Sequence, residues 1–248
     1  MLSTAPPPRY TVQVLLPYSQ ALNPNSIHRQ LIAWRSDVEA IGQGKENRYG
    51  HFGFAIPTGD LPLLAHVFHA SVDAYKTQLE DALAWSPSWV ERHQAVDACT
   101  HSIVISMVAH RAVNHATMLL AFLSVLDAVL ACVEDLRPAV LHWMPAQRVL
   151  AFSTYRMLRM EQGPCGPAIN VRIAAIGDHD VIADTVGLSG LGLPDLQAVA
   201  HDRDPAELTT RLTRLARSMF VGDALDCPWI EEQALCLPWR DAITVELD

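Results

Sequence analysis

Residues 184–197 read Asp-Thr-Val-Gly-Leu-Ser-Gly-Leu-Gly-Leu-Pro-Asp-Leu-Gln, and this stretch decides how the last part of the chain folds. Gly187, Gly190 and Gly192 are closely spaced, and a Pro-Asp step follows them. Glycine adopts positive φ at little steric cost, so the spacing predicts a specific turn between two strands. The composition of the stretch does not favour a charged catalytic loop.

A helix is expected directly after this turn and the strand that follows it. Asp204 suits the N-cap, Pro205 suits the first helical position, and Glu207 completes the pattern of a capping box. The helix is expected to continue to about Phe220 and to bury one stripe of residues at three- and four-residue steps: Leu208, Leu212, Leu215 and Met219.

The remaining pattern mixes strands and helices without a regular βαβα rhythm. Short apolar or alternating runs predict strands at 10–16, 51–56, 102–108, 139–143, 169–176, 181–188, 196–200 and 242–247. Helices are expected at 27–35, 63–84, 111–133 and from Pro145 to about Met160. We therefore expect an α+β fold with a largely antiparallel sheet and helices packed on one face. Residues 1–248 form one compact domain in this interpretation, or two sandwich-like halves (1–97 and 98–248) that divide near residues 95–101.

The charge of the chain is unevenly placed. The 248 residues carry a formal net charge of −9, and half of them are hydrophobic, which is enough for a sizeable core. Residues 178–248 contain 14 acidic and 5 basic side chains, so the whole excess lies there. An acidic surface repels nucleic acid and anionic lipid, and it attracts basic proteins. The charge predicts a protein partner, or serves only solubility.

Several features indicate a cytoplasmic protein. The cysteine count is five, the spacings are wide, and no Cys-x-x-Cys occurs, as expected of reduced thiols. The N-terminal residues show no basic region followed by an apolar run, so we expect no signal peptide. Residues 112–126 carry no formal charge, but the run is too short to span a bilayer and Asp127 interrupts its continuation. We expect a buried core helix there.

Thr185–Gln197, Asp204-Pro205 with its helix, Gly222-Asp223 and Pro238-Trp-Arg240 together resemble the bacterial domain-of-unknown-function family 4261. The resemblance implies one intact cytoplasmic domain and no established activity. It also suggests an immunity or accessory role beside a bacterial toxin system such as type VI secretion. The chain departs from the family pattern at Cys227-Pro-Trp-Ile-Glu-Glu232, where a Gly-rich turn is expected.

Patterns that carry enzymatic or metal chemistry are weak. No His-Glu-x-x-His or zinc-finger spacing occurs, and the glycines do not form a dinucleotide fingerprint or a Walker loop. Ser189 lacks the nucleophile-elbow spacing, and Cys165 would need a neighbouring base. Asp178, Asp180 and Asp184 flank His179 in what we interpret as a polar turn. We expect no cofactor, no metal and no catalytic residue.

The leading hypothesis is a non-enzymatic protein-binding domain whose partner is a basic protein such as a toxin. Acidic residues of 178–248 would steer association, and aromatic and arginine side chains would supply contacts. The candidate partner-binding residues are Trp229, Glu231, Glu232, Trp239, Arg211, Arg214 and Arg217.

Two alternatives remain open. The first is an enzyme or small-ligand binder with a pocket near residues 184–195, built from Arg172, His179, Asp184, Gly187, Gly190, Gly192 and Asp195. The second is a structural subunit of a larger assembly, held through the expected 145–160 helix with Arg148, Tyr155, Arg156 and Arg159.

Overall fold

Two compact units make up the computed structural model of the chain. It describes residues 9–19, 21–42, 51–58, 61–86, 89–108, 114–133, 140–202, 204–222 and the backbone of 242–246. The units divide between Met157 and Leu158. The predicted class is confirmed: the fold is α+β with largely antiparallel sheets.

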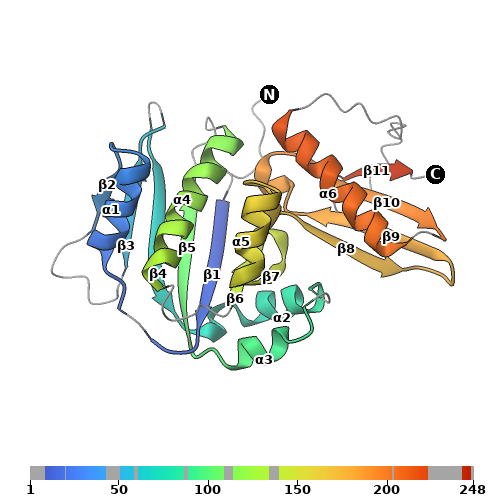
Figure 1. Ribbon diagram of the computed structural model, residues 1–248, viewed down its shortest axis with the longest axis horizontal. Coiled ribbons are helices and arrows are strands. Elements are labelled where there is room, and N and C mark those ends of the chain that lie inside the picture. Colours follow the sequence, from blue (N-terminus) through green and yellow to red (C-terminus); the bar gives the residue numbers. More distant parts are fainter. Residues whose placement is uncertain are drawn as a thin grey trace. The chain divides into compact units, whose positions relative to one another are not determined.

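The first unit is built on a seven-stranded sheet in which every neighbouring pair is antiparallel (Figure 1). In order across the sheet the strands are β2 (Glu39–Ile41), β3 (Phe52–Ile56), β4 (Leu63–Ala70), β5 (His101–Val108), β1 (Arg9–Leu16), β6 (Val140–Trp143) and β7 (Arg148–Ala151). The division between units therefore differs from the one predicted near residues 95–101. Strand β5 comes after the predicted division, yet it pairs with β1 and β4, which come before it. The predicted division would therefore cut through one sheet.

One face of this sheet holds the main apolar core under helix α4 (His115–Val133). Successive side chains of a strand point to opposite faces, so Tyr10 and Val12 share the α4 side of β1. The ring of Tyr10 stacks on Phe122 of α4 at 5.4 Å, and Phe122 meets the edge of Trp143 at 5.6 Å. Helix α1 (Pro24–Trp34) packs beside α4.

Helix α4 is long and apolar enough to cross a membrane by length and composition. In the structure 61% of the most apolar 18-residue stretch of this helix is buried inside the protein. Eleven of its residues are buried, so the helix packs as the sequence predicted for a core element.

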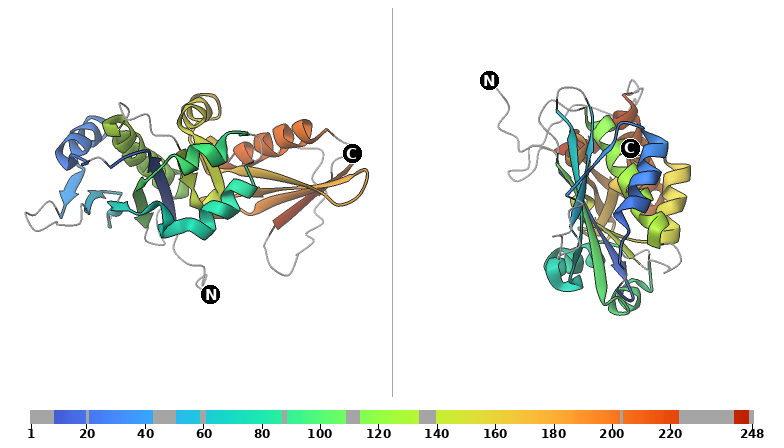
Figure 2. Two further views of the ribbon diagram at one scale, coloured as in Figure 1. Left: turned by 90° about the horizontal axis from the view of Figure 1, so that it is seen from below. Right: turned by 90° about the vertical axis from the view of Figure 1, so that its left-hand side faces the viewer.

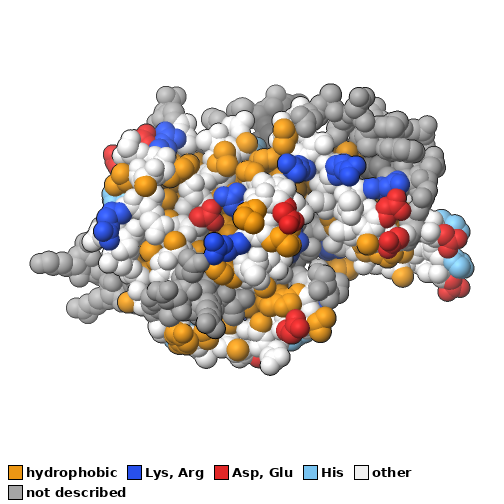
Figure 3. Space-filling model, in the orientation of Figure 1, with side chains coloured by type: hydrophobic (Ala, Val, Ile, Leu, Met, Phe, Trp, Pro, Cys, Tyr) orange, Lys and Arg blue, Asp and Glu red, His pale blue; other side chains and the backbone are white. Residues whose placement is uncertain are grey.

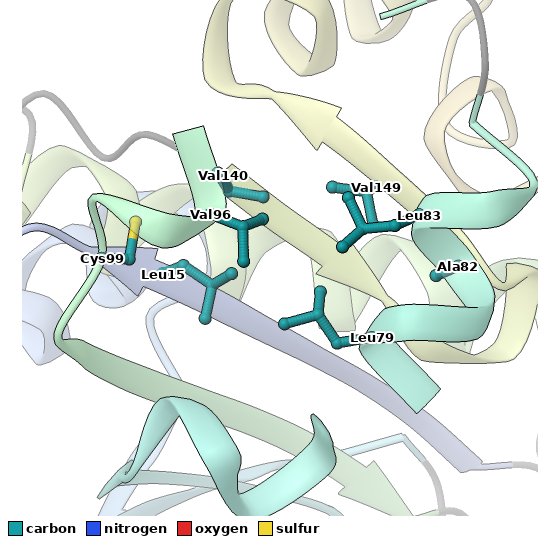
Figure 4. Packing of buried hydrophobic residues seen from close by; sticks show 8 residues of the cluster. All are labelled: Leu15, Leu79, Ala82, Leu83, Val96, Cys99, Val140 and Val149. Carbon is teal, nitrogen blue, oxygen red and sulfur yellow. The ribbon is translucent and has the colours of Figure 1, made fainter. Parts of the chain in front are cut away.

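The opposite face of the sheet is covered at one end by η1 (Val72–Tyr75), α2 (Lys76–Ala84) and α3 (Arg92–Asp97). Figure 2 shows α2 on the other side of the sheet from α1 and α4. The helices of this unit thus occupy both faces, not one as expected. A smaller apolar cluster joins them to the sheet (Figure 4): Leu15, Leu79, Ala82, Leu83, Val96, Cys99, Val140 and Val149.

A row of buried polar side chains lies on this second face. Gln13 donates from Nε2 to Ser102 Oγ at 3.1 Å, and its Oε1 lies 3.3 Å from His142 Nδ1. Both Gln13 and His142 are fully buried. His142 Nε2 has no hydrogen-bond partner in the part of the chain that the structure describes. Burial lowers the pKa of His142 from 6.5 to about 4, so the imidazole is neutral at pH 7.

The expected helix at 63–84 is wrong in its first half. Residues 63–70 form β4, which pairs with β3 and β5, and only Lys76–Ala84 is α-helical. Leu63, Ala65 and Val67 are buried while Leu64 is exposed, which is the alternation of a strand with one covered face. A run of six apolar residues and two histidines without a turn signal is ambiguous between the two structures.

The expected helix from Pro145 begins too early. Pro145 lies in the short 3₁₀ turn η3 (Met144–Ala146), and β7 intervenes before α5 (Phe152–Glu161). Gln147 adopts a positive φ of 48°, and the turn it makes lets β7 return along β6. The β-branched Val149 is buried on this strand.

The second unit has a four-stranded sheet with one helix packed on it. After η4 (Gly166–Ala168) come β8 (Asn170–Ala175), β9 (Asp180–Val186), η5 (Ser189–Leu191), β10 (Asp195–His201), α6 (Pro205–Val221) and β11 (Ala242–Glu246). Strands β8, β9 and β10 are antiparallel neighbours, and β11 lies parallel to β10 at the edge. Asp204 caps α6, as predicted, by accepting from the Ala206 amide at 3.0 Å. Gly222 ends the helix with a φ of 77°.

The sheet of this unit presents its apolar face to α6. The helix buries Leu208, Leu212, Leu215 and Ala216, whereas the predicted Met219 is only half-buried. Ala183 and Thr185 of β9 are also buried. Because strand side chains alternate, Asp180, Ile182 and Asp184 lie on the face away from the helix.

Candidate functional site

The glycine-rich connection between β9 and β10 closes on itself. Asp195 is buried, and its Oδ1 accepts from the Leu188 amide at 3.0 Å and from Thr185 Oγ1 at 3.3 Å. Thr185 Oγ1 in turn accepts from the Leu196 amide at 2.7 Å. Burial raises the pKa of Asp195, and these hydrogen bonds oppose the rise. The carboxyl group therefore serves to hold the turn.

The backbone of this turn explains its glycines. Gly187 and Gly192 have φ values of 113° and 75°, which other residues rarely adopt, and the turn predicted from the sequence is confirmed. Gly190 donates its amide to the Gly187 carbonyl at 3.1 Å. The side chains of Leu188 and Leu191 are buried beneath the turn.

Arg172 and Asp184 face each other across β8 and β9. They are register partners, and Arg172 Nε donates to Asp184 Oδ1 at 2.8 Å while Nη2 bonds to the other oxygen. Their side chains are 13% and 28% exposed, so this is a partly buried cross-strand ion pair. His179 precedes β9 by one residue, and Asp180 lies about 13 Å along the strand from Asp184. The structure thus brings Arg172 and Asp184 together but separates them from His179.

The candidate arginines of α6 have different surroundings. Arg211 pairs with Glu207 one helical turn before it. Arg214 and Arg217 are exposed, and neither forms an ion pair with another residue that the structure describes. The partner-binding candidates Trp229, Glu231, Glu232 and Trp239 lie outside the described residues.

The residues expected to join a larger assembly are partly used within the chain. Tyr155 is 2% exposed and its hydroxyl donates to Asp127 Oδ1 of α4 at 2.5 Å, so it is not available as a surface contact. The Arg156 guanidinium lies 5.8 Å from the centre of the Phe152 ring. Arg148 belongs to β7, where burial lowers its pKa to about 10, and Arg159 is half-buried on α5.

Thiol and groove candidates offer little chemistry. Cys165 is 2% exposed, and burial raises its pKa, so it is not poised as a nucleophile. An open groove of about 550 Å³ lies between α1 and α4 in the first unit. Small and polar residues line it: Ala21, Asn23, Ser26, Arg29, Gln30, Ala33, Ala131 and Cys132. Arg29 is the charged residue of that lining, and it donates to Ser26 Oγ at 3.2 Å.

A cluster of acidic and histidine side chains forms at the end of the second sheet where β9 begins and β10 ends. We call it the acidic tip, and it consists of Asp178, His179, Asp180, His201, Asp202 and Asp204. The register that pairs Asp180 with His201 brings the two chain segments together. Figure 3 shows the red and pale blue side chains gathered at this end of the unit. All four aspartates stay accessible, and the side chains of Asp180 and Asp202 are 50% and 63% exposed.

Histidine contacts organise the tip. His201 Nδ1 bonds to Asp180 Oδ1 at 2.7 Å, and its Nε2 lies 3.2 Å from Asp202 Oδ2. His179 Nδ1 bonds to the other oxygen of Asp202 at 2.8 Å. Asp202 has a φ of 48°, and its amide donates to the His179 carbonyl at 2.8 Å, so the backbone holds it between the two rings. The carboxylates raise the pKa of His201, the hydrogen bond to Asp180 first and the charge of Asp202 second.

The tip combines residues that the sequence partly identified. The sequence predicts a polar turn that contains Asp178, Asp180 and Asp184 around His179. Asp178 and His179 do lie in the β8–β9 connection, whereas Asp180 begins β9 and Asp184 lies within that strand. His201 and Asp202 were missed, because only the pairing of β9 with β10 makes them neighbours of that turn. Among the described residues, no group of three or more His, Cys, Asp or Glu side chains is arranged to hold a metal ion.

Comparisons with known proteins give no match. No family model fits the chain, and neither a curated protein nor a solved structure is significantly similar to it. The resemblance to family 4261 therefore stays a prediction.

Proposed function

We propose that this protein is a non-enzymatic binding protein whose acidic tip docks a basic surface of another protein. The observation that carries the proposal is the gathering of four exposed aspartates at one end of the second unit. The acidic excess of residues 178–248 agrees with it. An immunity or accessory protein of a bacterial toxin system, acting in the cytoplasm, is one role of this kind.

The contacts of the glycine turn favour this proposal over a ligand pocket at residues 184–195. Asp195 is engaged by backbone and hydroxyl donors of the turn itself, and Arg172 is paired with Asp184. A pocket that bound substrate would need polar groups that converge on open space. These groups instead converge on one another.

The physical basis of docking is long-range attraction. Exposed charges accelerate the encounter of oppositely charged proteins, and the effect falls with ionic strength because salt screens it over about 8–10 Å. In water, one unit charge at about 7 Å from a partner cation changes an encounter equilibrium by about threefold. Removing two of the four tip aspartates should therefore slow association by about ninefold at low salt.

The test uses Asp178→Asn together with Asp204→Asn. Asn also caps helices well, so the second change preserves the start of α6. A matched variant, Glu80→Gln with Asp81→Asn, removes the same charge from exposed positions of α2. Full-length proteins are used to capture partners from the source cells, and association rates with the captured protein are measured by surface plasmon resonance at two salt concentrations.

We expect the tip variant to associate about ninefold more slowly at low salt and the α2 variant to associate as wild type does. Equal rates for the tip variant and wild type would exclude the tip as the docking surface. Failure to capture any stoichiometric partner with folded protein would remove the binding proposal.

A further inference from the structure

The two nitrogens of His201 face two different carboxylates. Nδ1 bonds to Asp180 at 2.7 Å on β9, and Nε2 lies at ion-pair distance, 3.2 Å, from Asp202. A carboxylate only accepts hydrogen bonds, whereas a neutral imidazole carries one N–H and an imidazolium carries two. Both contacts are satisfied at once only when His201 is protonated.

We infer that protonation of His201 regulates the acidic tip, so that docking of a basic partner weakens when His201 is charged and strengthens when it is neutral. This inference rests on the proposed function, because it concerns the same surface. The protonated ring cancels one of the negative charges of the tip and ties Asp180 to Asp202. Loss of the proton returns that charge to the surface and removes one of the two hydrogen bonds that the ring gives to Asp180 and Asp202.

The charged groups around His201 come from three segments. Strand β9 contributes Asp180, and the turn before it contributes Asp178 and His179, whose ring centre lies 5.8 Å from that of His201. The residue directly after β10 is Asp202. The start of α6 follows with Asp204 and with Glu207, which is paired with Arg211. Arg203, which lies between Asp202 and Asp204 in the sequence, is outside the described residues.

The direction of the pH effect follows from these neighbours. Asp180 and Asp202 stabilise the imidazolium, so the pKa of His201 lies above its ordinary value of 6.5. Below that pKa the protonated ring holds both Asp180 and Asp202, and the tip is less negative. As the pH rises through it, the proton is lost and the tip gains one negative charge. Attraction to a cationic partner therefore increases with pH by about threefold at low ionic strength, and by less at physiological salt.

The experiment uses the full chain and a rhodamine-labelled octalysine peptide as a probe whose charge stays constant over the pH range. Fluorescence anisotropy gives the dissociation constant from pH 5.5 to pH 8.5 at low salt, a range in which lysine stays charged. In parallel, NMR follows the Cε1–H signal of His201, assigned by its loss in the variants. The variants are His201→Gln, which is always neutral, and His201→Arg, which is always charged. His93→Gln, at an exposed position on α3, is the control.

Wild type and His93→Gln should bind about threefold more tightly at high pH than at low pH. His201→Gln should bind at the tight limit and His201→Arg at the weak limit, each with most of the pH dependence lost. His179→Gln should keep the increase, because His201 still lies between Asp180 and Asp202 in that variant. The His201 signal should titrate above pH 6.5, and Asp180→Asn should lower its midpoint.

An equal pH dependence in wild type and His201→Gln would overturn the inference, as would a His201 midpoint at or below 6.5. Failure of the proposed function gives a different result. In that case the double variant Asp178→Asn, Asp204→Asn would bind the captured protein as fast as wild type at every pH, even if His201 titrates as expected. This result overturns both the proposed docking function and the pH regulation that rests on it.

Discussion

The buried His142 makes stability depend on pH in a way that can be calculated from its surroundings. The ring is 0% exposed, and its Nδ1 lies 3.3 Å from Gln13 Oε1 while Nε2 has no partner among the described residues. Because the amide nitrogen of Gln13 donates to Ser102, its Oε1 is the acceptor, and the His142 tautomer with a proton on Nδ1 fits. Adding a second proton would place an uncompensated charge in the core.

The sign follows from the two states. The folded pKa is about 4 and the unfolded value is 6.5, so the unfolded chain binds the proton first as the pH falls. The contribution of His142 is fully present above pH 6.5, decreases below it, and levels off near pH 4. The loss in the free energy of unfolding is about 2 kcal/mol at pH 5 and about 3 kcal/mol at pH 4.

His142→Asn isolates this contribution, because the amide nitrogen of Asn can take the place of Nδ1 and does not titrate. Urea unfolding is measured for both proteins at pH 7, 6, 5 and 4. Wild type should lose about 2 kcal/mol more than the variant between pH 7 and pH 5. His93→Asn, at an exposed position, should behave as wild type.

Equal losses for wild type and His142→Asn would refute the reasoning. If the variant does not fold, NMR of wild type decides the matter directly. A His142 signal that titrates near pH 6.5 in the folded protein contradicts a buried neutral ring, whereas a signal unchanged down to pH 5 supports it.

Two further predictions concern packing and backbone conformation. Phe122→Ala should lower the free energy of unfolding by about 3–5 kcal/mol in urea, because the ring is fully buried between Tyr10 and Trp143; a loss under about 1 kcal/mol would contradict this packing. Gly192→Ala should cost about 1 kcal/mol in the same assay, because its φ is 75°. Gly177→Ala, whose backbone does not have positive φ, should cost less, and equal costs would count against strain at Gly192.

The sequence predicts best those elements whose caps, turn residues or apolar periodicity lie within a few residues of one another. The cap, first turn and buried stripe of α6 depend on residues within one or two helical turns of each other. Asp204, Pro205 and the three leucines behave as expected, whereas Met219 is half-buried and Glu207, expected to complete a capping box, pairs with Arg211. The glycine turn is another such case, because positive φ at Gly187 and Gly192 is a property of the turn itself. The sequence makes Asp195 a ligand candidate, because its burial cannot be inferred from the residues next to it in the chain.

The errors occur where tertiary pairing overrides local pattern. Leu63–Ala70 is mostly apolar and contains no glycine or proline, so a helix and a strand fit its sequence equally well until β3 and β5 pair with its two edges. The division of the chain was misplaced for a related reason. Pairing of β1 with β5 joins residues 85 to 99 positions apart in the sequence, and no composition change marks such a contact.

The acidic tip is a consequence of the same pairing, and the core of the second unit determines it. Ala183 and Ala198 are register partners on the α6 side of the sheet, and both are fully buried. Their burial fixes the pairing, because a slip of one residue would carry Asp184 into the apolar face. With that register, Asp180 and His201 must be partners three positions farther along the two strands. No further sequence signal is needed to place His201 beside Asp180. The same apolar alternation that holds α6 on the sheet also brings this titratable ring between the carboxylates of Asp180 and Asp202.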